Sequence, residues 1–290
     1  MNTTANAPAA QTEYLEITRP DGSTGRIAYD DRGTGPLVVL APGMGVLRSS
    51  FRFLAPRLLE AGYRVVTTDY RGFGESDTGW DEYSSAATGR DLIALLRHLD
   101  GGPALLYGDS YAAAASVHVA ADAPELLRGV ILAGPFVRDL PAPNPIAKAV
   151  NWLVTKPMFT RQLWMTWVPK MYPKPAADFA EFRAAIDANF REPGRTAVFA
   201  AMCAGSHAPA EAKLPKAAAS GVPFLVVIGT ADADFPDPVA EAERTGKDLG
   251  APVELVEGVG HHPHEEDPAR IAELLIGFDP QGPNARGTAE

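Results

Sequence analysis

The stretch "LLYGDSYAAAAS" (residues 105–116) passes from an apolar run through Gly-Asp-Ser into a run of small residues. The apolar run predicts a buried strand, and the alanine-rich segment predicts a helix. A serine at a sharp strand-to-helix turn projects its hydroxyl beyond the end of the sheet. The residues two before and two after it must be small, because they crowd the neighbouring backbone. Gly108 and Ala112 meet this requirement around Ser110.

The same turn allows two other interpretations. A serine just before a helix is also a common N-cap with no chemical role. If Asp109 were the exposed nucleophile, Tyr107 and Tyr111 would occupy the crowded positions, which disfavours an aspartate there. The distinction depends on whether the chain supplies a base and an acid for Ser110.

Similar apolar runs alternate with helical patterns along most of the chain. This alternation predicts an α/β fold with a mostly parallel sheet flanked by helices, which begins with a hairpin between residues 13–18 and 26–33. The expected strands are 36–43, 64–72, 104–109, 129–134, 223–230 and 252–258, and the expected helices are 50–63, 84–100, 110–124, 238–249 and 268–278.

The alternation stops between residues 136 and 216, where only short helical patterns occur. We therefore expect a core domain at 12–135 and 217–278 and a helical cap at 136–216, inserted after the strand at 129–133. The segments 1–11 and 279–290 are small, polar and contain Pro or Gly, which indicates flexible tails.

The composition of the 290-residue chain is that of an ordinary soluble protein, with 46% hydrophobic and 21% charged residues. The formal net charge of −10 disfavours nucleic acids and anionic membranes as partners. No secretory signal and no membrane-spanning run is evident. The single cysteine, Cys203, is expected in the core and suits a reducing compartment, so we expect a cytoplasmic protein. Nothing in the sequence indicates an oligomeric state.

Polar residues follow two of the later expected strands. Asp232 comes three residues after the end of one strand at Gly229, and His261 follows the last strand. A serine hydroxyl needs an adjacent base, itself oriented by a carboxylate. The chain order Ser110, Asp232, His261 is the order expected for this architecture. Asp234 competes for the acid, and His262 and His264 compete for the base.

Five segments resemble the α/β-hydrolase superfamily, and the similarity covers roughly residues 12–278. They are "APGMG" (41–45), "DYRGFGESD" (69–77), "GDSYA" (108–112), "GTADADFPDP" (229–238) and "GHHPHEEDP" (260–268). The resemblance, nearest to bacterial esterase-like members, implies the α/β-hydrolase fold with a helical cap and the triad Ser110, Asp232 and His261.

The spacing in that family selects Asp232 over Asp234 and His261 over its neighbours. Asp234 is then expected to be a loop or capping carboxylate, and His264 to lie on the loop surface. His262 is expected to line the cleft.

An oxyanion hole needs backbone N–H groups aimed at the developing negative charge. One is expected from Tyr111, the residue after the nucleophile. The other is expected from Met44, with Gly43 and Gly45 as alternatives. Gly43 also lets the backbone approach a substrate.

The cap segment is rich in Trp and Met, most of which are expected to form its own core. An apolar underside over the site would bind an apolar group, with Trp152 and Trp164 as candidates beside Gly43 and His262.

Three nearby histidines raise the question of a metal, but their spacing fits no structural zinc site. "DYRGFGESD" lacks a phosphate-binding pattern and is expected to be a turn held by Arg71. We expect no metal and no cofactor.

The sequence thus predicts a serine hydrolase that cleaves a carboxylic ester or lactone of a small-to-medium apolar substrate through an acyl-enzyme on Ser110. The alternatives are a carbon–carbon bond hydrolase or perhydrolase that uses the same three residues, and a non-catalytic ligand-binding protein of the same fold.

Overall fold

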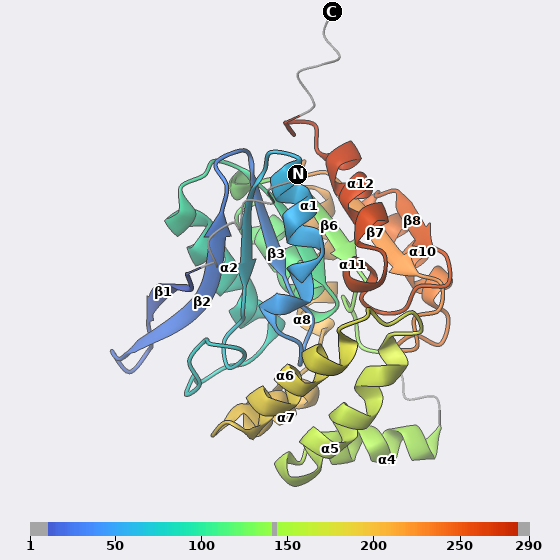
Figure 1. The fold of residues 1–290 in the computed structure, drawn as a ribbon. Helices are drawn as coiled ribbons and strands as arrows, with labels where there is room; N and C mark the ends of the chain where they lie inside the picture. The colour runs from blue at the N-terminus through green and yellow to red at the C-terminus, as the bar shows by residue number, and fades with distance from the viewer. Residues whose placement is uncertain (1–10, 141–143, 284–290) are drawn as a thin grey trace, which may run out of the picture.

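The computed structural model describes residues 11–140 and 144–283, and its centre is an eight-stranded sheet (Figure 1). The strand order is β1-β2-β4-β3-β5-β6-β7-β8, in which β2 pairs antiparallel with β1 and β4 and the remaining pairs are parallel. This confirms the predicted hairpin and mostly parallel sheet. The strands are β1 Glu13–Thr18, β2 Thr24–Arg32, β3 Leu37–Ala41, β4 Arg64–Thr68, β5 Ala104–Asp109, β6 Leu127–Ala133, β7 Phe224–Gly229 and β8 Val253–Val256.

Helices cover both faces of the sheet because the inner strands are apolar on both sides. In β3, Val39 packs with the layer of α2 and α3, whereas Val38 and Leu40 pack with the layer of α1 and α12. The core helices are α1 Leu54–Glu60, α2 Ser85–Leu99, α3 Tyr111–Asp122, α10 Pro238–Leu249, α11 Pro263–Glu266 and α12 Pro268–Phe278.

The segment between β6 and β7 is helical, as predicted. In Figure 1, α4–α7 lie together below the sheet, and we call them the α4–α7 layer. The short helices α8 and α9 return to the core, where they contact α3. The bounds are α4 Pro145–Val154, α5 Pro157–Trp167, α6 Phe179–Arg191, α7 Arg195–Ala204, α8 Ala208–Glu211 and α9 Leu214–Ala218.

The start of the expected C-terminal tail belongs to the core. Asp279 is buried and accepts hydrogen bonds from the buried guanidinium of Arg128, the shortest at 2.8 Å. This corrects the expected boundary, because a buried arginine requires a charged partner. Residues 284–290 and 1–10 of the expected tails lie outside the described residues. Among the described helices, none is long and apolar enough to cross a membrane.

Candidate active site

Ser110 occupies the turn between β5 and α3 in a backbone conformation that non-glycine residues rarely adopt, with φ 54° and ψ −115°. The turn is tightly packed. A Cβ atom added to Gly108 would lie 2.7 Å from the carbonyl oxygen of Ala112 and 2.4 Å from Ser116 Oγ. Only glycine fits at residue 108, and the methyl group of Ala112 is fully buried. The predicted requirement for small residues on both sides of the serine is therefore met.

The three side chains predicted as a triad form one line of hydrogen bonds. His261 Nε2 lies 2.7 Å from Ser110 Oγ, and His261 Nδ1 lies 2.7 Å from Asp232 Oδ2. Asp232 Oδ1 accepts a further hydrogen bond of 2.9 Å from the backbone N–H of Asp234, which fixes the carboxylate. The arrangement can move a proton from a serine hydroxyl to an oriented imidazole.

Close backbone contacts hold His261 in place. A Cβ atom on Gly134, at the end of β6, would lie 3.1 Å from Nδ1 of the His261 ring. The backbone N–H of His261 donates to the carbonyl of Met171 at 2.9 Å, in the chain that returns from α5. The imidazole is thus located by both the sheet and the helical segment.

The loop after β3 lies against the serine. A Cβ atom on Gly43 would lie 3.1 Å from Ser110 Cβ. The Tyr70 hydroxyl bridges this loop, since it donates to the Gly43 carbonyl at 2.8 Å and accepts from the Gly45 N–H at 2.7 Å. The Gly45 amide is therefore already engaged, which argues against it as an oxyanion donor.

Three backbone N–H groups near the serine, including that of Gly43, donate to no other group among the described residues. Within residues 11–140 and 144–283, neither Met44 nor Tyr111 donates its backbone N–H to another group. Tyr111 is the first residue of α3, where the helix leaves N–H groups without intrahelical acceptors. Met44 and Tyr111 are the two donors that the sequence predicts, and Gly43 stays an alternative to Met44.

A second carboxylate, Asp234, approaches His261 from its other side. Asp234 Oδ2 lies 3.4 Å from His261 Nε2, and the same side chain accepts a hydrogen bond from the Trp167 indole. Burial raises the pKa of Asp234. The sequence analysis considers Asp234 as a competing acid and then expects a loop or capping carboxylate. Its position two residues after Asp232 is the signal that could have placed it beside His261.

The charges around His261 favour its protonated form. Burial alone would lower the pKa of His261, but the carboxylates of Asp232 and Asp234 outweigh it and raise the pKa above its ordinary value. The site is thus built to stabilise an imidazolium.

A second buried Asp–His pair lies directly beneath the serine. Asp109 Oδ2 lies 2.7 Å from His262 Nδ1, and His262 Cε1 would be 3.0 Å from a Cβ atom on Gly43. Burial acts to raise the pKa of Asp109, but His262 and His264 outweigh it and lower the pKa. Asp109 is therefore held as a carboxylate beside His262.

The prediction that His264 lies on the loop surface is wrong. Its side chain is fully buried, with its ring 4.5 Å from that of Phe51 and Nδ1 3.4 Å from the Tyr107 hydroxyl. The reason is the short α11 turn, which directs His264 inward beneath the strand ends. Burial lowers the pKa of His264 to about 3.

Among the described residues, two groups of three side chains bring metal-ligand atoms within 4.8 Å of one another: Asp109 with His262 and His264, and Asp232 with Asp234 and His261. In each group an imidazole nitrogen is joined to a carboxylate oxygen at 2.7 Å. This hydrogen bonding competes with a metal ion for the same atoms.

The two candidate tryptophans lie in different places. Trp164 packs on Phe199 at 4.7 Å between ring centres and donates its indole N–H to the Gly45 carbonyl at 3.1 Å. Trp152 is exposed on α4, with Lys156 Nζ 4.8 Å from its ring centre. The structure brings Trp164 to the loop beside the serine and leaves Trp152 on the surface.

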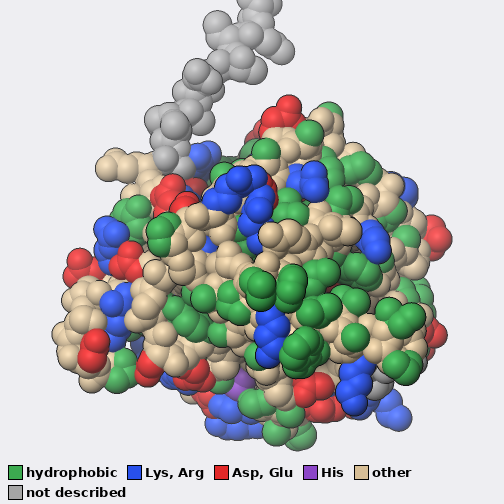
Figure 2. Space-filling model, turned by 90° about the horizontal axis from the view of Figure 1, so that it is seen from below, with side chains coloured by type: hydrophobic (Ala, Val, Ile, Leu, Met, Phe, Trp, Pro, Cys, Tyr) green, Lys and Arg blue, Asp and Glu red, His purple; other side chains and the backbone are tan. Residues whose placement is uncertain are grey.

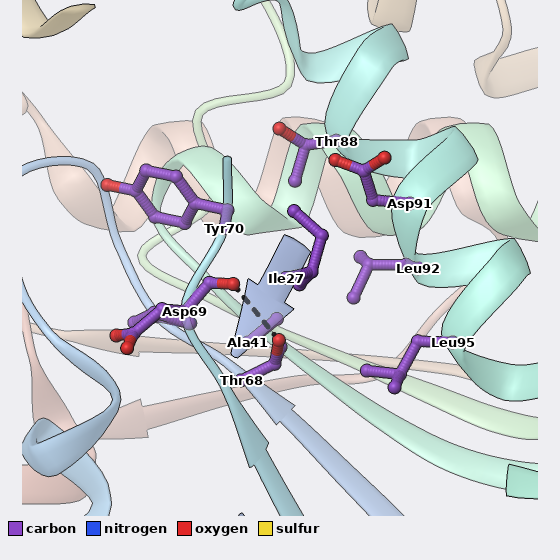
Figure 3. Close-up of a pocket in the computed structure, with 10 residues that line it drawn as sticks. Ile27, Ala41, Thr68, Asp69, Tyr70, Thr88, Asp91, Leu92 and Leu95 are labelled. Atoms are coloured by element: carbon purple, nitrogen blue, oxygen red, sulfur yellow. Dashed lines mark hydrogen bonds between the residues drawn. The ribbon is translucent and has the colours of Figure 1, made fainter. Parts of the chain in front are cut away.

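A small cavity lies behind the loop after β4 (Figure 3). It measures about 10 Å³ and is lined by Tyr70, Asp69, Thr88 and Asp91, among others. This is close to the space needed for a single water molecule. Asp91 forms a paired salt bridge with Arg71, the residue that the sequence predicts to hold this turn.

Residues 38–274 match the model of the alpha/beta hydrolase family. The chain is 28% identical to bifunctional epoxide hydrolase 2 of Sus scrofa over 169 residues, which are 57% of this chain and 28% of that protein. It spans less than half the length of the curated relatives that it matches.

Solved structures agree over nearly the whole chain. A bromoperoxidase from Bacillus anthracis superposes with a TM-score of 0.76 at 23% identity, covering 92% of this chain and 99% of that one. A thermophilic esterase from Thermogutta terrifontis gives a TM-score of 0.73 at 26% identity, with 92% and 97% covered. The chain belongs to the alpha/beta hydrolase family.

Proposed function

We propose that the protein is a serine hydrolase that cleaves a carboxylic ester or lactone through an acyl-enzyme on Ser110. The observation that carries the proposal is the continuous hydrogen-bonded line from Ser110 Oγ through His261 to Asp232, with 2.7 Å at each step. The similarity to the esterase from Thermogutta terrifontis supports the same reaction class.

In the proposed mechanism, His261 Nε2 takes the Ser110 proton while Oγ attacks the substrate carbonyl carbon. The N–H groups of Met44 and Tyr111 stabilise the resulting oxyanion. The intermediate collapses, and His261 gives its proton to the leaving alcohol. A water molecule, deprotonated by His261, then attacks the acyl-enzyme. His261 returns that proton to Ser110 Oγ as the acid leaves, which restores the free serine.

The surroundings of the site support an apolar substrate. A cluster of buried apolar side chains spans the loop beside Ser110 and the α4–α7 layer, including Val46, Tyr111, Met165, Phe199 and Met202. Trp164 and the half-buried Cys203 pack against this cluster. An apolar acyl or alcohol group bound there would be removed from water.

Asp109, which precedes Ser110 in the sequence, is the alternative carboxylate nucleophile at this turn. It lies in β5, fully buried, with Oδ2 bound to His262. This disfavours the covalent chemistry of an aspartate nucleophile and supports Ser110.

The test is hydrolysis of p-nitrophenyl esters from acetate to dodecanoate by wild type and the Ser110→Ala variant. We expect kcat to fall by about 10⁴–10⁶ in the variant, because the residual rate comes from binding and the oxyanion donors alone. A fluorophosphonate that labels wild type but not the variant would identify the nucleophile independently of the ester chosen. Labelling of Ser110 with no ester turnover would favour carbon–carbon hydrolysis, and no labelling would favour a binding protein.

A further inference from the structure

We propose that the α4–α5 surface binds the face of an anionic phospholipid bilayer. Seven large hydrophobic side chains are exposed among the described residues, and five of them lie on α4 and α5. The exposed fractions are 77% for Ile146, 42% for Val150, 60% for Trp152, 73% for Met158 and 42% for Phe159. We call these five residues the apolar patch.

The apolar patch is not the remainder of a packed helix face. None of the residues of α4 is buried, although the helix is amphipathic. In Figure 1, α4 and α5 lie at the end of the molecule distant from the sheet, and the five patch side chains that they carry are exposed. Figure 2, a view from that side, shows hydrophobic side chains gathered in the middle of the face with Lys and Arg among them. Protruding apolar residues on a surface helix are the feature that enters the lipid headgroup region.

The charge of this region is opposite to that of the whole chain. Residues 140–177 contain no Asp or Glu but five basic residues, in a chain of net charge −10. Four of them, Lys148, Lys156, Lys170 and Lys174, form no ion pair within the described part of the chain. The ammonium groups of Lys156 and Lys170 instead lie 4.8 Å from the ring centres of Trp152 and Trp167. Positive charge beside aromatic and aliphatic side chains matches an anionic headgroup layer above an acyl region.

Two other partners, a second copy of the chain and a single-stranded nucleic acid, fit the apolar patch less well than a membrane does. A second copy related by two-fold symmetry would place the same patch against itself, which brings unpaired lysines together. A single-stranded nucleic acid would need a row of stacking aromatic groups along a basic groove, whereas three of the five patch residues, Ile146, Val150 and Met158, are not aromatic. The net charge argued against an anionic membrane only as an average over the chain. An anionic membrane would contact the local positive charge on α4 and α5 and not the average charge of the chain.

The experiment is flotation of the full chain with vesicles of phosphatidylglycerol and, separately, of phosphatidylcholine. We expect binding to the anionic vesicles only, weakened at high salt because the charges are screened. Ile146→Ser with Met158→Ser should lower the partition coefficient at least about tenfold. Lys148→Glu should lower it at least about fivefold, since one lysine near the surface contributes this much.

Matched controls lie elsewhere on the surface. Tyr14→Ser with Leu255→Ser removes the two exposed large hydrophobic side chains outside the patch, and Arg97→Glu reverses an exposed charge on α2. These variants should bind like wild type, and thermal unfolding should show that every variant is folded. Because the readout is binding, failure of the ester-hydrolase proposal would not affect it.

Three results would overturn the inference. These are no binding to anionic vesicles, equal losses in the patch and control variants, or a dimer in sedimentation velocity that is abolished by Ile146→Ser with Met158→Ser. The last would assign the patch to a second copy.

Discussion

At the scale of single residues, the chemistry depends on which groups touch the His261 ring. Asp232 binds Nδ1, and Asp234 lies 3.4 Å from Nε2, on the side that faces Ser110. Two carboxylates around one imidazole make the imidazolium unusually favourable. This has a consequence for the pH dependence of the proposed reaction.

The Asp234→Asn variant should move the acid limb of kcat/KM to lower pH. A negative charge beside His261 raises its pKa, so removing that charge lowers the pKa, and the imidazole stays neutral and basic to lower pH. We expect a shift of about one pH unit, typical of a charge at this distance. The control is Asp237→Asn, in the same loop, which keeps the N-cap of α10. An unchanged acid limb in Asp234→Asn would contradict the argument.

Tyr70 acts on the reaction through the loop rather than by touching the substrate. Its hydroxyl joins the Gly43 carbonyl to the Gly45 N–H, on both sides of Met44. Tyr70→Phe should lower kcat by about ten- to a hundredfold with little change in KM, because the Met44 N–H would lose its alignment for the oxyanion. The control is Tyr29→Phe in β2, which removes a hydroxyl that donates to Glu13 in β1. A change confined to KM would show that Tyr70 serves substrate binding instead.

At the scale of elements, the strand-to-helix turn at β5 and α3 places Ser110. The turn requires a close approach of the backbone at residue 108, where a Cβ atom would meet Ala112 O at 2.7 Å. The Ala112 carbonyl is part of the helix backbone, so it cannot move away from an added Cβ atom as a flexible side chain can. The geometry of the serine therefore depends on the absence of a side chain two residues before it.

Gly108→Ala should destabilise the protein by about 2–3 kcal/mol, the cost of overpacking a tight core, and should also reduce kcat. Urea unfolding measures the first effect and ester hydrolysis the second. Gly277→Ala in α12 is the matched control, because no atom lies within 4 Å of its added Cβ. That control should leave stability equal or raise it by up to about 1 kcal/mol. If the two variants were equally stable, the claim that residue 108 has no room for a side chain would be wrong.

At the scale of the whole molecule, an ion-pair network joins the core to the α4–α7 layer. Arg52 pairs with Asp178 at 2.7 Å, just before α6, and with Glu265 at 2.6 Å, in α11. Glu265 also accepts a hydrogen bond of 2.7 Å from Tyr172, whose ring lies against His262. The helical layer and the buried histidines are thus parts of one packed unit.

The stability of that unit should depend on His264. Its pKa falls to about 3 on folding because of burial, so below pH 6.5 the unfolded chain binds a proton that the folded chain does not. Stability is then lost as pH falls from about 6.5 toward 3, by about 2 kcal/mol at pH 5. His264→Asn should remove this part of the acid sensitivity.

Urea unfolding at pH 7 and pH 5 measures the difference. The loss between the two pH values should be about 2 kcal/mol smaller in His264→Asn than in wild type. His98→Asn, at an exposed position of α2, is the control and should follow wild type. An unchanged loss in His264→Asn would show that acid sensitivity resides elsewhere.

Local pattern was sufficient for the succession of strands and helices along the chain and for the helical insertion, whereas the resemblance to the α/β-hydrolase superfamily selected Asp232 and His261 from their neighbours. Strand and helix periodicities are properties of short segments. The ends of parallel strands meet at one edge, so residues that follow them in the sequence are brought together by the topology alone. The position of Tyr111, directly after the serine, and of the loop after β3 that carries Met44 follow from the same topology.

Tertiary structure alone decided which other polar residues reach the site and which apolar residues stay in water. His264 is buried, Asp234 faces His261, and Trp152 is exposed because of contacts between segments far apart in the chain. Burial and pKa depend on the sum of such contacts, which no short window of sequence contains. For the same reason, an acidic chain carries a basic, apolar surface on α4 and α5 that its net charge conceals.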